Sequence, residues 1–337
     1  MIIYLWRNYG PWSTDYKLTT MENKTYGIIG LGKMGLNLAL QAVEKGYKII
    51  GYDKHTPPNI TEPNLILTDS LKSLVQELPK PRKIFIYIPA GKAVDVVIGE
   101  LTPLLDKGDI IIDGGNSYWG DSICRAEKAK EQGLFLIDCG TSGGTSGARN
   151  GACFMIGGDK EAVKHVEGLL KDLAVSNGYT HCGASGSGHF VKLVHNGIEF
   201  GMLQAIGEGM DLLEHYREKL DISEILYTWN HGSVVRSWLI ELMKKLYDEK
   251  HGFNVPSYVE DTGEVNWLVG DAMRMEVSIP VISQSVMQLI ASRDKDHTSP
   301  KAIAMMRNGF GGHPFGTDAG IEHERHYGRV GGYREEK

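Results

Sequence analysis

The chain has 337 residues, of which 42% are apolar and 23% charged, as in an ordinary globular protein. This length exceeds what one compact core usually reaches, so we expect two domains. The formal net charge of −6 at pH 7 leaves no general basic field, which argues against nucleic acid or an anionic membrane as a partner.

The cysteines and the first residues bear on the cellular compartment. Four cysteines are spread along the chain without a C-x-x-C pair, which favours reduced thiols over disulfides or bound metal. No apolar run approaches the roughly 20 residues of a membrane span, and the start of the chain lacks the apolar block of a signal peptide. We therefore expect a cytoplasmic protein, and we interpret residues 1–22 as an N-terminal extension or a misplaced start.

The first half of the chain alternates strands with helices. An apolar run at 26–30 is followed by a Gly-rich turn and a helical pattern ending at Gly46, and a second strand is predicted at 47–53. Further strands are predicted at 83–89, 109–115, 134–138 and 153–158. Apolar strands that alternate with helices are typical of a mostly parallel sheet covered on both faces. We therefore predict an α/β, doubly wound Rossmann-type domain over residues 23–183.

The pattern changes after about residue 185. Long helical stretches are predicted at 188–216, 222–250 and 267–293. We expect a smaller, all-helical C-terminal domain over 184–317. Residues 318–337 are rich in Gly, His and charge without periodicity, so we expect them to form a loosely held tail.

The Gly-rich turn after the first strand has the pattern G-x-G-x-x-G. It consists of Gly30, Leu31, Gly32, Lys33, Met34 and Gly35. The glycines allow the tight turn, a close approach to a pyrophosphate and close packing of helix on strand, with the phosphates at the helix N-terminus. Asp53 ends the next strand, where a carboxylate accepts hydrogen bonds from the adenosine ribose. The strand, the Gly-rich turn, the helix and the acid together favour a dinucleotide site over a Gly-rich turn without a ligand.

Asp53 also bears on the choice of dinucleotide. Its negative charge repels the 2′-phosphate of NADP at short range, so NAD is favoured. Lys54 and His55 follow directly and soften this preference, so NADP stays open as the alternative.

Four polar residues interrupt the first long helical stretch with the spacing i, i+3, i+4, i+7, which places them on one helix face. They are Lys192, His195, Asn196 and Glu199. A second, apolar stripe has the same spacing, and we expect it to form the buried side while the polar side is wet. Its members are Val191, Val194, Ile198 and Met202.

Glycines are unusually frequent around this stripe, although each costs up to about 1 kcal/mol in a helix relative to Ala. They are Gly186, Gly188, Gly197, Gly201, Gly207 and Gly209. This cost indicates that something approaches the helix closely. A base and an acid two turns apart suit two carbons of one small substrate. Partial burial would lower the pKa of Lys192 from about 10.4 towards neutral pH, which a catalytic base requires. From the residues alone, a polar contact between helices is equally compatible.

Six separated segments carry a further signal through their order and spacing. They are GIIGLGKMG (27–35), IPAG (88–91), DGGNS (113–117), DCGTSGG (138–144), GSGHFVKLVHNGIEFGMLQAIGEG (186–209) and RNGFGGH (307–313). Together they resemble the short-chain form of the decarboxylating 6-phosphogluconate dehydrogenases, within the β-hydroxyacid dehydrogenase superfamily. The resemblance implies an enzyme of the pentose phosphate pathway that oxidises the C3 hydroxyl of 6-phosphogluconate with NAD or NADP, releases CO2 and forms ribulose 5-phosphate.

The resemblance also implies roles for single residues. Lys192 would take the proton of the C3 hydroxyl and then polarise the keto oxygen, and Glu199 would protonate C1 of the enediol. His195 and Asn196 would hydrogen-bond the substrate near its reacting carbons. The remaining contacts would come from Ser142, Gly143 and Gly144 at the carboxylate and hydroxyl end, from Asn116 between nicotinamide and substrate, and from Pro89 and Ala90 at the cofactor.

The segment 307–313 implies an oligomer. In the family, an Arg and a His near the C-terminus bind the substrate phosphate of a neighbouring subunit, and Arg307 and His313 match them. The guanidinium fork of Arg suits bidentate binding of phosphate. We therefore expect a homodimer or homotetramer with shared active sites.

The sequence departs from the family at the phosphate site. Phe200 stands where the family usually has a Tyr that contacts the phosphate, and Glu264 lies in the stretch where long-chain members have a Lys. An unphosphorylated sugar acid, another β-hydroxyacid dehydrogenase activity and a catalytically silent nucleotide-binding protein therefore stay open. His195, Glu199 and the Arg307–His313 pair disfavour the second, and the intact polar stripe disfavours the third.

Overall fold

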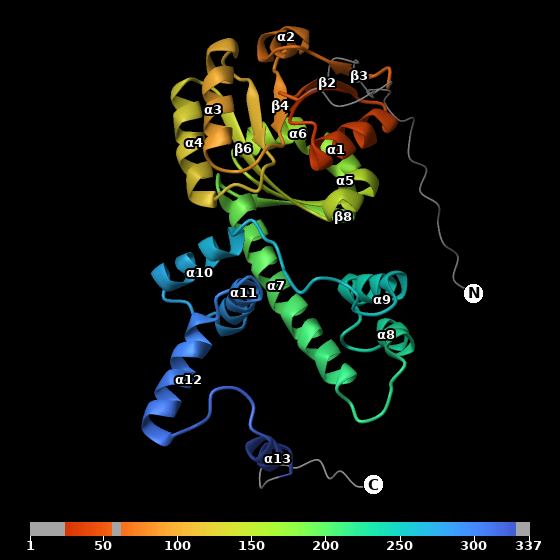
Figure 1. Cartoon of the computed structure of the whole chain (residues 1–337). Coiled ribbons are helices and arrows are strands. Elements are labelled where there is room, and N and C mark those ends of the chain that lie inside the picture. Colours follow the sequence, from red (N-terminus) through yellow and green to blue (C-terminus); the bar gives the residue numbers. More distant parts are fainter. Residues whose placement is uncertain (1–23, 56–61, 328–337) are drawn as a thin grey trace, which may run out of the picture. The chain divides into compact units, whose positions relative to one another are not determined.

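The computed structural model describes residues 24–55 and 62–327 (Figure 1). The expected N-terminal extension, residues 1–22, and residues 328–337 of the expected tail lie outside this range. The described chain forms two compact units. The first contains the residues up to Leu212 together with Thr262–Ser283, and the second contains Leu213–Asp261 and the chain from Gln284 onward.

The first unit is built on an eight-stranded sheet with the order β3-β2-β1-β4-β5-β6-β7-β8. Neighbouring strands are parallel, except that β6 and β7 are antiparallel. The strands are β1 (Thr25–Ile29), β2 (Lys48–Tyr52), β3 (Leu65–Leu67), β4 (Lys83–Ile86), β5 (Ile110–Asp113), β6 (Phe135–Ser142), β7 (Ala152–Gly157) and β8 (Ala174–Gly183). The predicted doubly wound sheet is confirmed.

Helices cover both faces of the sheet (Figure 1). One face packs against α1 (Lys33–Glu44), α5 (Gly144–Asn150) and α6 (Lys160–Leu173). The other face packs against α2 (Leu71–Glu77), α3 (Lys92–Leu101), which leads into a 3-10 turn η2 (Thr102–Leu104), and α4 (Trp119–Glu131). Because both faces are covered, β1, β4 and β5 are buried along their whole length, which explains their continuous apolar sequences.

The order of the strands defines where a ligand can bind. The chain runs from β1 to β2 and β3 on one side and then returns to place β4 on the other side of β1. Such a reversal opens a crevice at the carboxyl ends of the strands. The G-x-G-x-x-G turn follows β1 and the segment 88–91 follows β4, so both predicted cofactor segments reach this edge.

Two strands are missing from the sequence predictions. β3 has only three residues, of which Leu65 is buried while Ile66 and Leu67 are 36% and 38% exposed. β8 lies at the other edge of the sheet and none of its residues is buried. β3 is apolar but has only three residues, and β8 mixes polar with apolar residues, so neither gives the longer apolar run that reveals the central strands.

The helical part of the chain is more divided than predicted. The first predicted stretch is one helix, α7 (Ser187–Glu214), but the second is α8 (Ile222–Asn230) and α9 (Trp238–Lys250), and the third is α10 (Glu264–Arg274) and α11 (Pro280–Ser292). Ser237 caps α9 by accepting from the N–H of Ile240, and Pro280 suits the first turn of α11. The assignment of 184–317 to one domain stays a prediction.

Two further helices lie in the second unit, α12 (Thr298–Gly311) and α13 (Ala319–Tyr327). α13 lies within the stretch from residue 318 onward, which we expect to be a loosely held tail, and that expectation stays a prediction. Asp318 accepts hydrogen bonds from the N–H groups of Gly320 and Ile321, which stabilises the start of α13 despite its weak apolar periodicity. Among the described residues, no helix is both long and apolar enough to cross a membrane.

Candidate active site

The first turn of α7 is fixed to the sheet by Asp138 of β6. Its buried carboxylate accepts hydrogen bonds from the backbone N–H groups of Gly186 at 2.7 Å and His189 at 2.9 Å. These donors lie where a helix leaves N–H groups without partners of its own. Gly188 brings the turn onto the neighbouring strand, because a Cβ there would lie 2.5 Å from the carbonyl oxygen of Met155. The polar stripe therefore starts from a defined position at the sheet edge.

Lys192 is 6% exposed and lies across Gly140 of β6. A Cβ at Gly140 would lie 2.5 Å from the Cβ of Lys192, so only glycine leaves room for this side chain. The Lys192 Nζ donates a hydrogen bond to Asn196 Oδ1 and lies 3.5 Å from His195 Nδ1. Burial lowers the pKa of Lys192, against smaller opposing effects of nearby Glu199 and Glu264. The predicted direction of this shift is confirmed.

The rest of the polar stripe meets the end of β6. His195 Nε2 lies 3.1 Å from Ser142 Oγ, and His195 Nδ1 lies 3.2 Å from Asn196 Oδ1 and 3.9 Å from Glu199 Oε2. Gly143 and Gly144 follow with φ angles of +114° and +58° and begin α5. Residues 142–144 and the stripe, which are far apart in the sequence, therefore form one polar cluster.

Asn116 joins this cluster from the end of β5. Its Oδ1 accepts a hydrogen bond from the N–H of Thr141 at 3.2 Å, and its φ angle is +52°. A left-handed conformation is costly for a residue other than glycine and tends to persist at functional sites. Asp113 holds the turn by accepting from the N–H of Gly115 at 3.0 Å and from Ser117 Oγ at 2.7 Å.

The turn between β1 and α1 has the geometry of a dinucleotide cradle. Gly30 has a φ angle of +91°, and a Cβ on Gly35 would overlap the carbonyl oxygen of Gly30. At Gly32, in contrast, a Cβ would meet no described atom within 4 Å, so the outer side of the turn is open. Lys33 and Met34 begin α1, whose N-terminus adds backbone donors. This open space beside a helix N-terminus fits a pyrophosphate.

Asp53 lies at the same edge of the sheet as the Gly-rich turn. Its Oδ2 accepts from the N–H of Leu31 at 2.6 Å, and its Oδ1 accepts from the N–H of His55 at 2.8 Å. The carboxylate is thus held at the end of β2 directly beside the Gly-rich turn. Its remaining lone pairs are available to ribose hydroxyls.

The loop that contains Pro89 and Ala90 is held by a residue that the sequence analysis did not single out. Arg125 of α4 is 5% exposed and donates to the carbonyl oxygen of Gly91 at 3.1 Å. It also donates to Asp113 Oδ2 at 3.2 Å. Arg125 therefore ties the loop after β4 to the loop after β5, on which Asn116 lies.

The expected burial of α7 is wrong for its apolar stripe. Val191, Ile198 and Met202 are 39%, 54% and 41% exposed, whereas Lys192 is buried. Lys192 is buried because β6 packs against it, whereas the side chains of His195 and Glu199 are each 41% exposed. The face that is packed within the chain carries Gly197 and Gly201, against which α10 and the start of α11 lie.

The glycines of α7 are used for packing within the chain. A Cβ on Gly197 would overlap Leu268 of α10, and a Cβ on Gly186 would lie 2.7 Å from Ile123 of α4. The expectation of a close approach is confirmed at these positions. A Cβ on Gly207 or Gly209 would meet no described atom within 4 Å, so the expectation fails there.

Arg307 and His313 belong to the second unit and are not part of the cluster described above. Arg307 lies on α12 and is exposed. His313 follows the helix, and its carbonyl oxygen accepts from Asn308 Nδ2 at 2.8 Å.

Four residues that hold the site together were not predicted from the sequence. They are Asp138 and Gly140 beside α7, Arg125 between the loops after β4 and β5, and Glu264 as a partner of Asn196. Asp138 and Gly140 stand inside the quoted segment DCGTSGG, so their signal was present without an assigned role. Arg125 and Glu264 lie in segments without a motif, and only tertiary contacts reveal them.

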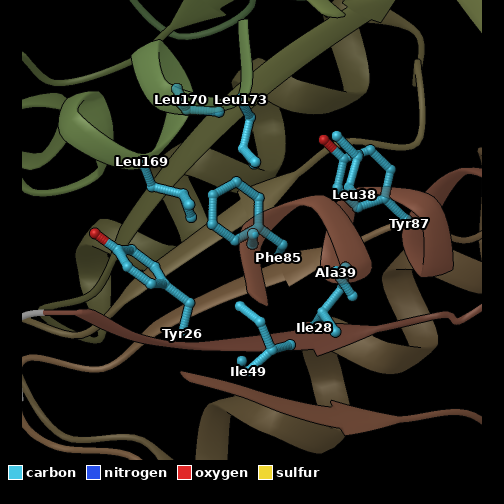
Figure 2. Close-up of a pocket in the computed structure, with 12 residues that line it drawn as sticks. Tyr26, Ile28, Leu38, Ala39, Ile49, Phe85, Tyr87, Leu169, Leu170 and Leu173 are labelled. Carbon is cyan, nitrogen blue, oxygen red and sulfur yellow. The ribbon is translucent and has the colours of Figure 1, made fainter. Parts of the chain in front are cut away.

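A further hollow lies among the described residues of the first unit. Figure 2 shows a pocket between the sheet, α1 and α6, lined by apolar side chains such as Ile28, Leu38, Phe85 and Leu170. None of the predicted site residues lines it. Within the described ranges, no group of three or more His, Cys, Asp or Glu residues is placed to hold a metal ion.

Two family descriptions match the chain in sequence order. Residues 25–183 match the NAD binding domain of 6-phosphogluconate dehydrogenase, and residues 188–316 match the 6-phosphogluconate dehydrogenase C-terminal domain. Together they cover the Gly-rich turn, the polar stripe and Arg307 with His313.

Individual relatives agree with this match. YqeC of Bacillus subtilis is 42% identical over 85% of this chain and 97% of the relative. The NAD(+)-dependent, decarboxylating 6-phosphogluconate dehydrogenase of Haloferax volcanii is 37% identical over 85% of this chain and 97% of that relative. Among solved structures, the 6-phosphogluconate dehydrogenase of Plasmodium falciparum superposes with a TM-score of 0.74 at 31% identity, covering 88% of this chain and 66% of that one.

Proposed function

This chain belongs to the 6-phosphogluconate dehydrogenase family, and we propose that it oxidises and decarboxylates 6-phosphogluconate to ribulose 5-phosphate with NAD as the preferred cofactor. The observation that carries the proposal is Lys192, a buried lysine with a lowered pKa at the centre of a polar cluster. A lowered pKa favours the neutral amine, which is the form of lysine that can accept a proton.

Lys192 acts first as the base and then as an acid. Its neutral amine takes the proton of the C3 hydroxyl, and the resulting ammonium group polarises the C3 keto oxygen while the carboxyl group leaves as CO2. Asn196 Oδ1 accepts from the ammonium group and so orients it. Electrostatic stabilisation of the developing enolate oxygen by a fixed cation is among the strongest contributions an active site makes.

Glu199 completes the reaction by protonating C1 of the enediol. It lies about two helical turns after Lys192, roughly 10.5 Å along the helix axis, so the two groups suit different atoms of an extended substrate. His195 bridges the two parts of the site, because its ring nitrogens lie near Ser142 Oγ and Asn196 Oδ1. Ser142 and the backbone at Gly143 and Gly144 supply hydrogen bonds for the carboxylate and hydroxyl end.

The cofactor is held at the edge formed by the ends of β1, β2 and β4. The open turn at Gly32 and the α1 N-terminus would hold the pyrophosphate, and Asp53 would bind the adenosine ribose. When bound, the nicotinamide accepts the hydride from C3 of the substrate. The carboxylate of Asp53 disfavours a 2′-phosphate, which supports NAD over NADP.

We also propose that the active enzyme is a homodimer or homotetramer in which Arg307 and His313 bind the phosphate of a substrate in a neighbouring subunit. The exposed apolar residues of α7, among them Val191, Ile198 and Met202, support association of copies. Their burial between subunits would recover the hydrophobic free energy that the separate chain leaves unused.

A coupled assay tests the proposed reaction. Purified protein is supplied with 6-phosphogluconate and NAD or NADP, and the reduced cofactor and CO2 are measured together. We expect one CO2 for each reduced cofactor and a higher kcat/KM with NAD. Reduction without CO2 would contradict decarboxylation, and a higher kcat/KM with gluconate than with 6-phosphogluconate would contradict the phosphorylated substrate.

A further inference from the structure

Glu264 is the first residue of α10 and has no role in the reaction as proposed above. Its Oε2 accepts a hydrogen bond from Asn196 Nδ2 at 3.0 Å, and its Oε1 accepts from Thr262 Oγ1 at 3.3 Å. The preceding Gly263 has a φ angle of +78°, so the chain turns sharply where α10 begins. A carboxylate from a distant part of the sequence is thus bonded to the residue that contacts Lys192.

The contact with Glu264 determines which way the amide of Asn196 points. An ionised carboxylate only accepts hydrogen bonds, so it selects the NH2 end of the amide. The carbonyl end of Asn196 must then face Lys192 Nζ, which only donates when charged. Without Glu264, the NH2 group could rotate towards Lys192, where two donors would meet.

The carboxylate is carried by a firmly anchored helix. Asp271 of α10 is 1% exposed and accepts from Tyr118 OH at 2.8 Å and from Trp119 Nε1 at 2.7 Å. Leu268 of the same helix packs against α7 at Gly197. Because the middle and the C-terminal half of α10 are held within the first unit, the backbone that carries Glu264 has a defined position relative to Asn196.

We propose that Glu264 is a positioning residue, which fixes the amide of Asn196 and through it the ammonium group of Lys192. The inference rests on the proposed function, in which Lys192 is the base. It explains why this chain has an acidic residue in a stretch where a phosphate-binding cation was expected from the family: the acid faces the catalytic stripe.

The charge of Glu264 also affects how readily Lys192 loses its proton. The groups around Lys192 are Glu199 and His195 on its own helix, Cys153 on β7 and Glu264 on α10. The two carboxylates raise the pKa of Lys192, whereas burial lowers it by a larger amount. Removing the charge of Glu264 therefore lowers the pKa of Lys192 further, and the amine becomes neutral at a lower pH.

Two substitutions separate the charge from the hydrogen bond. Glu264→Gln keeps an oxygen that accepts from Asn196 but removes the charge, and Glu264→Ala removes both. We expect Glu264→Gln to keep kcat within about threefold while the acid limb of its pH profile moves down by about half a pH unit. We expect Glu264→Ala to lose about 10- to 100-fold in kcat, as for loss of a charge-assisted hydrogen bond, with an unchanged Kd for NAD.

Glu161→Gln is the matched control, because Glu161 lies in the first turn of α6, is exposed and pairs with Lys164. Its pH profile should superimpose on that of the parent protein. The positioning role is overturned if Glu264→Ala loses no more kcat than Glu264→Gln. The effect of the Glu264 charge on Lys192 is overturned if the profile of Glu264→Gln also superimposes on that of the parent.

A measurement without turnover separates this inference from the proposed function. Acetic anhydride acetylates neutral amines, so the rate of Lys192 acetylation against pH, followed by mass spectrometry, reports its protonation directly. A lower midpoint in Glu264→Gln supports the inference even if the parent shows no activity on 6-phosphogluconate, which would contradict only the proposed function. An active parent with the same midpoint in both proteins would contradict only the inference.

Discussion

Lys192 shows how a single residue depends on its surroundings. A lysine at a solvent-exposed position is protonated at neutral pH and is a poor base. Here β6 covers the side chain, because Gly140 leaves room for it, and burial lowers the pKa of the amine. Asn196 keeps the ammonium form bonded, so both protonation states have a place in the reaction.

Replacing Lys192 should separate chemistry from cofactor binding. We expect Lys192→Met to reduce kcat by about 10²–10⁴-fold or more, since it removes the positioned base, while the Kd for NAD measured by fluorescence titration stays unchanged. Lys164→Met, at an exposed position on α6, serves as the control and should retain full activity. Substantial turnover by Lys192→Met would show that another group is the base.

The pH dependence should follow the lowered pKa of Lys192. The base must be neutral, so kcat/KM falls as the pH drops below the pKa of Lys192 in the free enzyme. Because burial lowers this pKa from its ordinary value of 10.5, the acid limb should lie below pH 10.5. An acid limb centred at or above that value in a kcat/KM profile would contradict the role of Lys192.

Asp53 should control the choice between NAD and NADP. Asp53→Asn keeps an oxygen that accepts from the N–H of Leu31 but removes the negative charge. We expect the kcat/KM ratio of NAD to NADP to fall by about tenfold, because repulsion of the 2′-phosphate is relieved. An unchanged ratio in steady-state assays would show that Asp53 does not discriminate between the cofactors.

At the scale of elements, the Gly-rich turn and α7 are positioned in the same way. The turn follows the buried strand β1, and the first turn of α7 is bonded to the buried carboxylate of Asp138. Both use glycine where backbone contacts backbone. Gly35 packs α1 against the carbonyl oxygen of Gly30, and Gly188 packs α7 against β7. The functional groups then occupy the open side, at Gly32 in the turn and along the polar stripe of α7.

Two substitutions in the same turn should have opposite effects. Gly35→Ala should lower the free energy of unfolding by about 1–3 kcal/mol, because its Cβ would overlap the carbonyl oxygen of Gly30. Gly32→Ala should change stability by less than about 1 kcal/mol but raise the Kd for NAD at least about tenfold, because its Cβ would enter the pyrophosphate space. Denaturant unfolding and NAD titration check both, and tight NAD binding by Gly32→Ala would contradict the cradle.

At the scale of the whole molecule, the two ends of the proposed site come from different units. The proposed base and acid belong to α7 in the first unit, and the proposed phosphate ligands, Arg307 and His313, belong to the second. A shared site between subunits makes the two sets of residues separable by mutation.

Complementation should reveal such sharing. Lys192→Met and Arg307→Ala proteins are each expected to be weakly active, the second through a raised KM for 6-phosphogluconate. Unfolding and refolding them together should restore activity. Some sites in the mixed oligomer then combine the intact Lys192 of one variant with the intact Arg307 of the other. Activity no greater than the sum of the two variants, with mixed oligomers demonstrated by mass spectrometry, would contradict shared sites.

Much of this organisation can be predicted from local patterns. The central strands β1, β4 and β5 are continuous apolar runs, and the spacing of Lys192 and Glu199 identifies one helix face. The edge strands β3 and β8 could not be predicted, since β3 has only three residues and β8, which has no buried residue, carries no continuous apolar run. The buried side of α7 was predicted wrongly, because the periodicity of one helix does not say what packs against it.

The sequence by itself determined the doubly wound sheet, the dinucleotide turn, the polar stripe and the family, because each of these depends on residues close together in the chain or on motifs in a fixed order. Only the tertiary structure decided that Lys192 is buried against Gly140, that Asp138 fixes α7 and that Glu264 faces Asn196. These contacts join residues distant in sequence. Burial and long-range hydrogen bonds, which set the pKa of Lys192, exist only once the chain has folded.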